Sequence, residues 1–294
     1  MVYLLFAILC STSLNVIFKL SEQNGSNRLA VTLFNFTGAT LISLAAIVKS
    51  AASDSSWFSV FLSDFSGFMQ PTPSVLALLL GFLNGFLYFG AFYVLQLSTS
   101  RNGSAMTATF NKLGVMVPAI LSVIFFHEIP RPLQIVGVLV ALLAILIIYL
   151  KKEENSVITL KLALFATFFF GGFADFTSKV YQVYGVEKYQ SMFLFFTFFF
   201  SLLITGVFMI VKDRRIKHTD IIFGLVSGIP SQLISLFLLH ALSTVPAFVL
   251  FPLYSVGVIL VVNIINLMFF KEKLTVRQFA AIGLIVTAVV LLNL

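Results

Sequence analysis

Charged residues and cysteine are scarce in this sequence. Asp, Glu, Lys and Arg make up 10% of its 294 residues, whereas a soluble domain carries about 25%. Cys10 is the only cysteine, which excludes an intrachain disulfide. The histidines, His127, His218 and His240, lie too far apart in the sequence to suggest a metal site. Composition therefore argues against a soluble domain and against metal or redox chemistry, and no cofactor is expected.

Apolar residues take the place of the missing charge. Hydrophobic side chains account for 60% of the chain and the mean hydropathy is +1.07, which is typical of a protein that lies mostly in lipid. At about 20 apolar residues for each membrane-crossing helix, the length predicts about ten spans. The formal charge of +7 comes from basic residues in short loops, so it indicates membrane orientation rather than nucleic-acid binding.

The order of apolar runs and polar breaks predicts an all-α membrane protein with ten transmembrane helices. The expected helices cover residues 2–19, 29–48, 74–96, 104–126, 133–150, 162–180, 191–211, 221–242, 247–269 and 277–293. The opening "MVYLLFAILC" is expected to be a retained first helix rather than a signal peptide. The longest gap, 49–73, places Trp57, Phe61 and Phe65 at helical spacing, which predicts either an amphipathic helix at the membrane interface or an ordered loop.

The second half of the sequence repeats the first. "FFHEIPRPLQ" at 125–134 returns 144 residues later as "FFKEKLTVRQ", which pairs Glu128 with Glu272. "GFLNG" at 81–85 matches "GLVSG" at 224–228, and both contain the GxxxG spacing that lets two helix backbones approach closely. We therefore predict a first five-helix repeat over 1–150, a linker over 151–161 and a second repeat over 162–294.

Five spans in each repeat have a geometric consequence. Because five is odd, the second repeat must enter the membrane from the side opposite to the first, so the two repeats are inverted. Inverted repeats are typical of secondary transporters, in which rocking of the repeats exposes a central site to each side in turn. The predicted function is therefore transport of a small organic metabolite by alternating access, as export or exchange.

Several short motifs, taken in order, resemble one transporter family. They are "LST" at 97–99 and 242–244, Glu128 and Glu272 after the fourth and ninth helices, and Gly137 and Gly283 in the helices that follow. On these residues the chain resembles EamA-type members of the drug/metabolite transporter (DMT) superfamily over nearly its whole length. The resemblance implies ten helices in two repeats, no enzymatic activity, and a location in the bacterial inner (plasma) membrane.

Lys112 lies within an otherwise apolar run, where a charge costs roughly 3 kcal/mol or more at mid-bilayer. Three roles would explain a lysine at this position despite the cost. It could bind an anionic substrate group such as a carboxylate or phosphate, form an ion pair with Asp175, or take part in proton coupling. We favour the first. Related sugar-phosphate translocators place lysines in comparable helices, and the repeat maps Lys112 onto Val256, so the architecture itself does not demand a lysine.

The remaining candidates are the other polar groups inside predicted helices. The predicted substrate-binding residues are Lys112, Asn111, Asn84, Tyr88, Gln232, Ser231, Tyr254 and Ser255. Asp175 and His240 are candidates for proton coupling, and Asn15, Lys19 and Lys179 form a symmetric set with a gating role. The alternatives are an ion pair between Asp175 and Lys179 one helical turn apart, a hydrogen-bonded neutral His240, and snorkelling of Lys19 and Lys179 to the headgroups. Glu128 and Glu272 are predicted to be structural, accepting from backbone N–H groups where the next helix begins.

Two other classes of function compete with transport. A membrane-embedded enzyme needs a nucleophile or a His/Asp pair near the interface, and the sequence contains no HxxxxD, HExxH or GxSxG motif. A non-transporting receptor or assembly factor needs a recognition domain, for which the short loops leave no room. The expected partners are a small-molecule metabolite, which is anionic if Lys112 binds it, and the lipid bilayer, with proton coupling or exchange as a further option and no nucleic acid.

Overall fold

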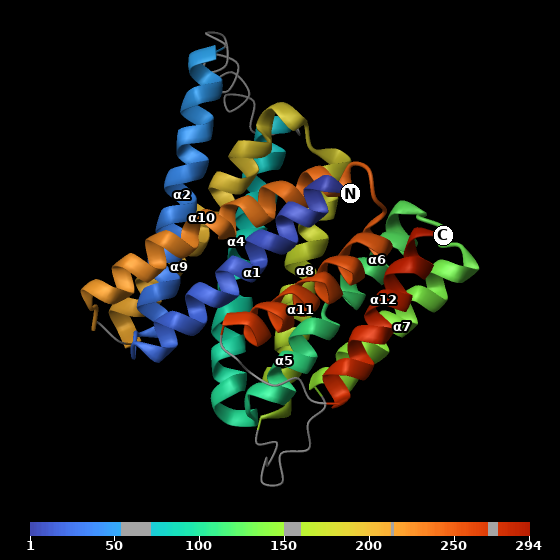
Figure 1. Cartoon of the computed structure of the whole chain (residues 1–294). Helices are drawn as coiled ribbons and strands as arrows, with labels where there is room; N and C mark the ends of the chain where they lie inside the picture. The colour runs from blue at the N-terminus through green and yellow to red at the C-terminus, as the bar shows by residue number, and fades with distance from the viewer. Residues whose placement is uncertain (54–71, 150–159, 213–214, 270–275) are drawn as a thin grey trace. The chain divides into compact units, whose positions relative to one another are not determined.

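The computed structural model describes residues 1–53, 72–149, 160–212, 215–269 and 276–294 (Figure 1). These residues form α-helices joined by short turns, with no β-strand among them. The helices are α1 (Val2–Gln23), α2 (Arg28–Ser53), α4 (Pro73–Asn102), α5 (Ser104–Leu113), α6 (Met116–Phe126), α7 (Pro132–Tyr149), α8 (Lys161–Tyr184), α9 (Gln190–Lys212), α10 (His218–Leu242), α11 (Ala247–Phe269) and α12 (Val276–Asn293), with a short 3-10 turn, η1 (Glu187–Tyr189), before α9.

The helices have the length and composition of membrane spans. Within the described ranges, eight helical segments are long and apolar enough to cross a membrane: α1, α2, α4, the segment Met106–Phe126, and α9 to α12. The sequence predicts two more spans, which correspond to α7 and α8. The apolar part of α7 is shorter, and α8 carries Lys161, Asp175 and Lys179 within its 24 residues. The prediction of an all-helical, multi-pass membrane protein is confirmed.

Several helices extend beyond their predicted bounds. The first helix was expected to end at residue 19 but continues to Gln23, and the third continues to Asn102. Polar residues mark where a helix leaves lipid, whereas the helix itself ends where the backbone changes conformation. Here that change comes at Gly25 and Gly103, whose φ angles are 62° and 82°. A residue with a side chain rarely adopts this left-handed region.

Hydroxyl side chains inside the helices bond to their own backbone. Thr40 donates to the carbonyl of Phe36 at 2.6 Å, and Thr197 donates to the carbonyl of Phe193 at 2.9 Å. Such bonds satisfy a hydroxyl without a partner from another helix. Serine and threonine are therefore tolerated in these apolar helices without marking a binding site.

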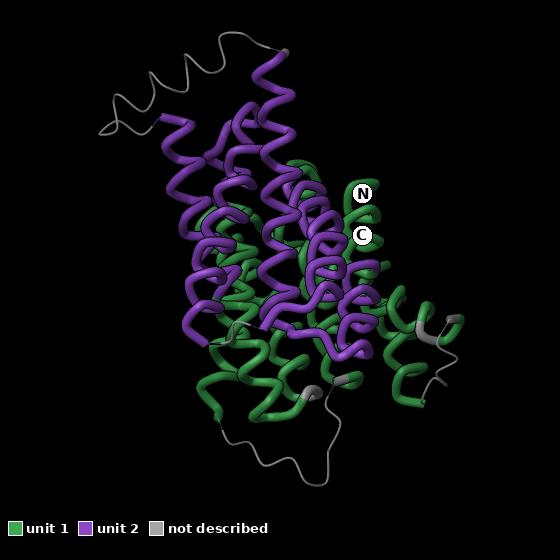
Figure 2. The backbone as a smooth tube through the Cα atoms, turned by 90° about the vertical axis from the view of Figure 1, so that its left-hand side faces the viewer, with its two compact units in different colours: residues 1–12, 90–179, 240–294 green, residues 13–89, 180–239 purple. Residues whose placement is uncertain are grey.

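The chain forms two compact units, and each unit contains segments from both halves of the sequence (Figure 2). Unit 1 consists of residues 1–12, 90–179 and 240–294, and unit 2 consists of 13–89 and 180–239. The sequence repeats 1–150 and 162–294 thus both contribute to each unit. The predicted interface helix within 49–73 falls mainly on 54–71, and most of the predicted linker and Glu272 also lie outside the described residues.

Unit 1 is held together by packing of α7 along α12 and of α6 against α11. A Cβ atom added to Gly137 on α7 would lie 2.9 Å from Cγ of Leu292, so the missing side chain permits the close approach of α12. Ile145, Val256 and Ile285 are buried in the core between these helices.

Unit 2 is built around α2 and α9, and the two GxxxG motifs dock onto these helices. On α4, a Cβ atom at Gly85 would lie 2.8 Å from the carbonyl oxygen of Thr197 on α9. On α10, a Cβ atom at Gly228 would lie 2.7 Å from the carbonyl oxygen of Asn35 on α2. Because these contacts are with backbone that cannot move aside, only glycine allows the approach. The predicted packing role of both motifs is confirmed.

Candidate functional site

The helix predicted over 104–126 has a break in its hydrogen-bond ladder near the middle. The break divides it into α5 and α6 at Gly114 and Val115, whose φ and ψ angles stay in the right-handed helical region. Pro118 has no N–H with which to bond the carbonyl of Gly114, and Val117 bonds that carbonyl instead, at 3.0 Å. Helix α8 lies against this break, because a Cβ atom at Gly172 would lie 2.5 Å from the Gly114 carbonyl oxygen. The prediction of one span is kept, since Met106–Phe126 is a single membrane-length segment, but its hydrogen-bond ladder is interrupted, as the missing N–H of Pro118 explains.

Lys112 and Asp175 interact electrostatically beside this break. Lys112 lies in the last turn of α5 and Asp175 on α8, three residues after Gly172, and both are half-buried. Asn111 lies against Gly171 on the same stretch of α8. Opposite charges brought together in a helical membrane protein offset part of the cost of burying each one. Unit 1 therefore contains a cation and an anion on neighbouring helices next to an interrupted helix.

A second pair in unit 1 joins Lys179 to Glu128. Nζ of Lys179 lies 2.9 Å from Oε1 of Glu128, and both side chains are largely buried. The other carboxylate oxygen of Glu128 accepts from the backbone N–H of Ala247, the first residue of α11, at 2.8 Å. Glu128 was expected to bond the start of a following helix, and the helix it bonds is α11 rather than its neighbour α7. The snorkelling prediction for Lys179 is wrong, and the Asp175–Lys179 pair is replaced by these two pairs.

In unit 2, polar side chains from α2, α4 and α10 form one connected strip. Nδ2 of Asn35 donates to the hydroxyls of Ser227 and Ser231 at 2.9 and 2.8 Å. One turn along α10, the Ser235 hydroxyl bonds the Tyr88 hydroxyl at 3.1 Å and donates to the Ser231 carbonyl at 3.3 Å. Two of the predicted substrate-binding residues, Tyr88 and Ser231, thus belong to one network.

Two more predicted residues, Asn84 and Gln232, are buried in unit 2 without a partner for their side-chain oxygens. Their exposed fractions are 1% and 3%. Oδ1 of Asn84, Oε1 of Gln232 and Oδ1 of Asn35 have no hydrogen-bond partner among the described residues. Buried polar atoms in proteins rarely lack a hydrogen-bond partner.

The other predicted residues are more scattered. In unit 1, Ser255 is buried and Tyr254 half-buried on α11, and the ring of His240 lies 5.1 Å from that of Tyr3. In unit 2, Asn15 is exposed and Lys19 half-buried on α1. The structure therefore brings together Lys112, Asn111 and Asp175 in unit 1, and Tyr88, Ser231 and their neighbours in unit 2.

Sequence reasoning missed Asn35, Ser227 and Ser235. Asn35 is fully buried and is the centre of the unit 2 network. Its signal was an amide within the apolar run "TLFNFTG", the same kind of signal that identified Asn84. Ser227 and Ser231, four residues apart, could have indicated a polar face on α10.

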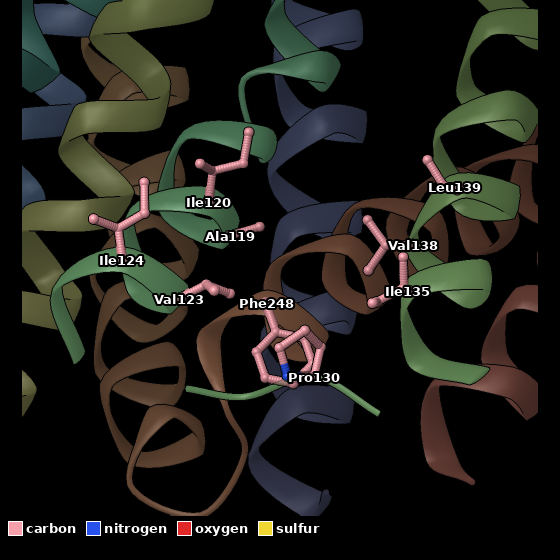
Figure 3. A pocket seen from close by; sticks show the side chains of 9 residues that line it. All are labelled: Ala119, Ile120, Val123, Ile124, Pro130, Ile135, Val138, Leu139 and Phe248. Carbon is pink, nitrogen blue, oxygen red and sulfur yellow. The ribbon is translucent and has the colours of Figure 1, made fainter. Parts of the chain in front are cut away.

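An apolar cavity of about 250 Å³ lies in unit 1 between α6 and α7 (Figure 3). Its walls are aliphatic residues such as Ile120 and Val138, with Pro130 and the ring of Phe248 from α11. No charged or hydrogen-bonding side chain lines it. Such a cavity suits hydrocarbon and lacks the groups that would select a polar metabolite.

Across the described residues there is also no group of three or more His, Cys, Asp or Glu that could hold a metal ion.

Comparisons with known proteins bear on the fold. No protein-family model matches the chain. A relative from Haemophilus influenzae, described as an uncharacterized protein, is 23% identical over 281 residues, which cover 92% of this chain and 90% of the relative. A solved structure, described as a crystal structure of a protein, has a TM-score of 0.75 and 14% sequence identity, covering 99% of this chain and 94% of that one. This chain is therefore similar in fold, along almost its whole length, to a protein of known structure.

Proposed function

We propose that this chain is a secondary transporter of the EamA type, within the drug/metabolite transporter superfamily, and that it moves a small organic anion without ATP. In this proposal the first repeat comprises α1, α2, α4, the interrupted helix α5–α6, and α7. The second repeat comprises α8 to α12. Four observations support it.

The first is which helices pack together. The pairs α2 with α9, α6 with α11, and α7 with α12 are in contact within their units. They are the second, fourth and fifth helices of each proposed repeat. Equivalent helices meet in this way when a twofold axis relates the repeats, as the inverted arrangement requires.

The second is the exchange of glycine contacts. The third helix of the first repeat, α4, docks its GxxxG motif onto α9, the second helix of the second repeat. The third helix of the second repeat, α10, docks its motif onto α2, the second helix of the first. Reciprocal contacts of this kind also follow from twofold symmetry.

The third is the set of contacts between loops. With ten spans, the turns after α1 and α9 lie on one side of the membrane, and the Lys217 ammonium donates to the Gly25 carbonyl there at 2.9 Å. The turn after α6 and the turn before α11 lie on the other side, where Glu128 accepts from Ala247. Arg131 in the turn after α6 donates to the backbone oxygen of Leu294, which ten spans also place on that second side. A different parity of spans would put some of these partners on opposite sides.

The observation that carries the function is the pair of Lys112 and Asp175. Lys112 comes from the first repeat and Asp175 from the second, and both lie beside the break between α5 and α6. Transporters of inverted-repeat architecture place their sites between the repeats, at interrupted helices. An anionic substrate group takes over the pairing with Lys112, and a proton then neutralises Asp175. Binding of substrate at Lys112 is thereby linked to binding of a proton at Asp175.

We place the protein in the inner membrane of a bacterium. The helices long enough to cross a membrane and the similarity to a protein of Haemophilus influenzae support this location.

Transport by the purified protein in proteoliposomes tests the proposal. Vesicles preloaded with one unlabelled metabolite are given labelled carboxylates and organic phosphates in the absence of ATP. We expect one class of anion to show accelerated exchange that depends on the protein. If no anion exchanges, and the metabolites of overexpressing cells are also unchanged, the chain is not a transporter of this kind.

A further inference from the structure

We infer that the polar strip of unit 2 is a binding site for a monovalent alkali cation, built from neutral oxygen atoms of α2, α4 and α10. The inference concerns a site in unit 2 that the proposed transport of an anion does not use. It does not depend on that proposal, because cation binding can be measured without transport.

The starting observation is three buried oxygen atoms without partners. Asn35, Asn84 and Gln232 are 0%, 1% and 3% exposed, and their side-chain oxygens accept no hydrogen bond within the described part of the chain. A fourth such atom, the Ser26 hydroxyl oxygen, lies in the turn before α2 and is separate from the strip. A buried acceptor left without a partner costs about 1–3 kcal/mol. Three in one unit therefore require an explanation.

The residues that carry the three oxygens lie on helices that contact one another in unit 2. Asn35 is tied to Ser231 by a hydrogen bond, and Gln232 lies one turn after Gly228, which approaches the backbone of Asn35. Ser231 is linked through Ser235 to the Tyr88 hydroxyl. Asn84 is one turn before Tyr88 on α4, so the two side chains occupy one face of that helix.

The chemistry of the strip favours a cation. Amide carbonyl and hydroxyl oxygens are the ligands that coordinate alkali ions in channels and transporters. One water molecule can donate only two hydrogen bonds and cannot satisfy three acceptors, whereas a cation can be coordinated by all three. The hydroxyls of Ser231 and Ser235 can turn their lone pairs toward the same ion.

The charge of the strip favours a monovalent ion. Neither α2 nor α4 contains an acidic residue, and the only one in α10 is Asp220 in its first turn. The Asp220 carboxylate is already engaged by the backbone N–H groups of Asn27 and Lys217. Calcium and magnesium sites in proteins normally include carboxylates. A ligand set without negative charge therefore suits Na⁺ or K⁺ better than a divalent cation.

The test is thermal unfolding of the purified, detergent-solubilised protein in NaCl, KCl and choline chloride at equal ionic strength. We expect a saturable rise in Tm of about 3 °C with Na⁺ or K⁺ over choline. Asn84→Leu and Gln232→Met remove unpaired oxygens while keeping volume. Both variants are expected to fold and to lose the alkali-dependent shift.

Thr205→Val is the matched control. Thr205 is buried in unit 2, but its hydroxyl donates to the Ser201 carbonyl of its own helix at 2.6 Å. This variant should keep the full response to the alkali ion. The inference is overturned if choline raises Tm as much as Na⁺ and K⁺, or if both Asn84→Leu and Gln232→Met respond like the unmodified protein. Equilibrium binding of labelled Na⁺ and K⁺ to the unmodified protein gives a second readout, and the absence of saturable binding of either ion would also overturn it.

Discussion

Two pairs of opposite charges lie in the described part of unit 1, and they differ in how firmly each is held. Glu128 binds Lys179 through one oxygen and the Ala247 N–H through the other. Lys112 and Asp175 influence one another electrostatically, but they are not among the salt bridges of the described residues. A charge with one partner can exchange it for a ligand, whereas a carboxylate that also caps a helix cannot do so without loosening that helix. The first pair is therefore structural and the second is available for function.

Replacement of Lys112 by methionine tests the substrate role. We expect Lys112→Met to reach the membrane and to raise the KM for the anionic substrate about tenfold or more, because a hydrogen bond to a charged group contributes about 1.5–3 kcal/mol. Lys161→Met, at an exposed lysine in the same unit, is the control and should leave KM unchanged.

The double variant Lys112→Met with Asp175→Asn separates the two roles of the pair. If Lys112 only neutralises Asp175, the double variant regains normal transport. An unchanged KM in the single variant would rule out substrate binding by Lys112.

Replacement of Glu128 by glutamine tests the structural role of the second pair. Glu128→Gln leaves the buried Lys179 without its counter-charge and weakens the contact at the start of α11, so we expect a loss of about 3 kcal/mol of stability. Adding Lys179→Met should restore part of that loss. Thermal unfolding in detergent measures both effects.

The control for this prediction is Glu22→Gln. Glu22 pairs with Arg28 at 3.1 Å, but both side chains are about half exposed. An exposed pair contributes about 0–1 kcal/mol, so this change should be small. The structural assignment of Glu128 is wrong if Glu128→Gln abolishes transport and leaves stability unaltered.

At the scale of helices, glycine decides how closely neighbours approach. Gly85→Ala places a methyl group 2.8 Å from both Cβ of Phe200 and the carbonyl oxygen of Thr197. We expect this variant to lose about 1–3 kcal/mol of stability, because α4 must move away from α9. At Gly206, on α9, the nearest atom to an added Cβ is Cδ1 of Leu33 at 3.7 Å. Gly206→Ala should therefore be neutral or slightly stabilising, and equal unfolding temperatures for the two variants would contradict the packing argument.

The positions and types of the helices could be predicted from the sequence, because lipid requires long apolar runs whose backbone bonds are internal. The break at Gly114 could not. Pro118 lies in the predicted helix, but proline is tolerated in many membrane helices, and the approach of Gly172 adds a tertiary contact. Likewise, Glu128 and Lys179 were both recognised as individual residues. Their pairing depends on the fold, since 51 positions separate them in the chain.

At the scale of the whole molecule, the parity of the spans can be tested with single cysteines. In a Cys10→Ser background, cysteines are introduced at four exposed positions, Asn24, Ile129, Lys161 and Val186. With ten spans, cysteines at positions 24 and 161 react with an impermeant maleimide added on one side of the membrane. Cysteines at positions 129 and 186 react with maleimide added on the other side. Reaction of positions 129 and 161 from the same side would show that α7 does not span.

The way in which both halves contribute to each unit has a consequence for biogenesis. When the ribosome has made the first 150 residues, α2 still lacks its partner α9, and α7 still lacks its partner α12. The glycine faces and apolar surfaces of this first half therefore contact lipid instead of protein. Membrane insertion of that half can proceed, because each helix satisfies its own backbone. Its compaction cannot, since the partners have not yet been synthesised. Unit 2 can close once α10 emerges, and unit 1 must wait for α12, so the nascent protein matures in an order set by its partners rather than by its halves.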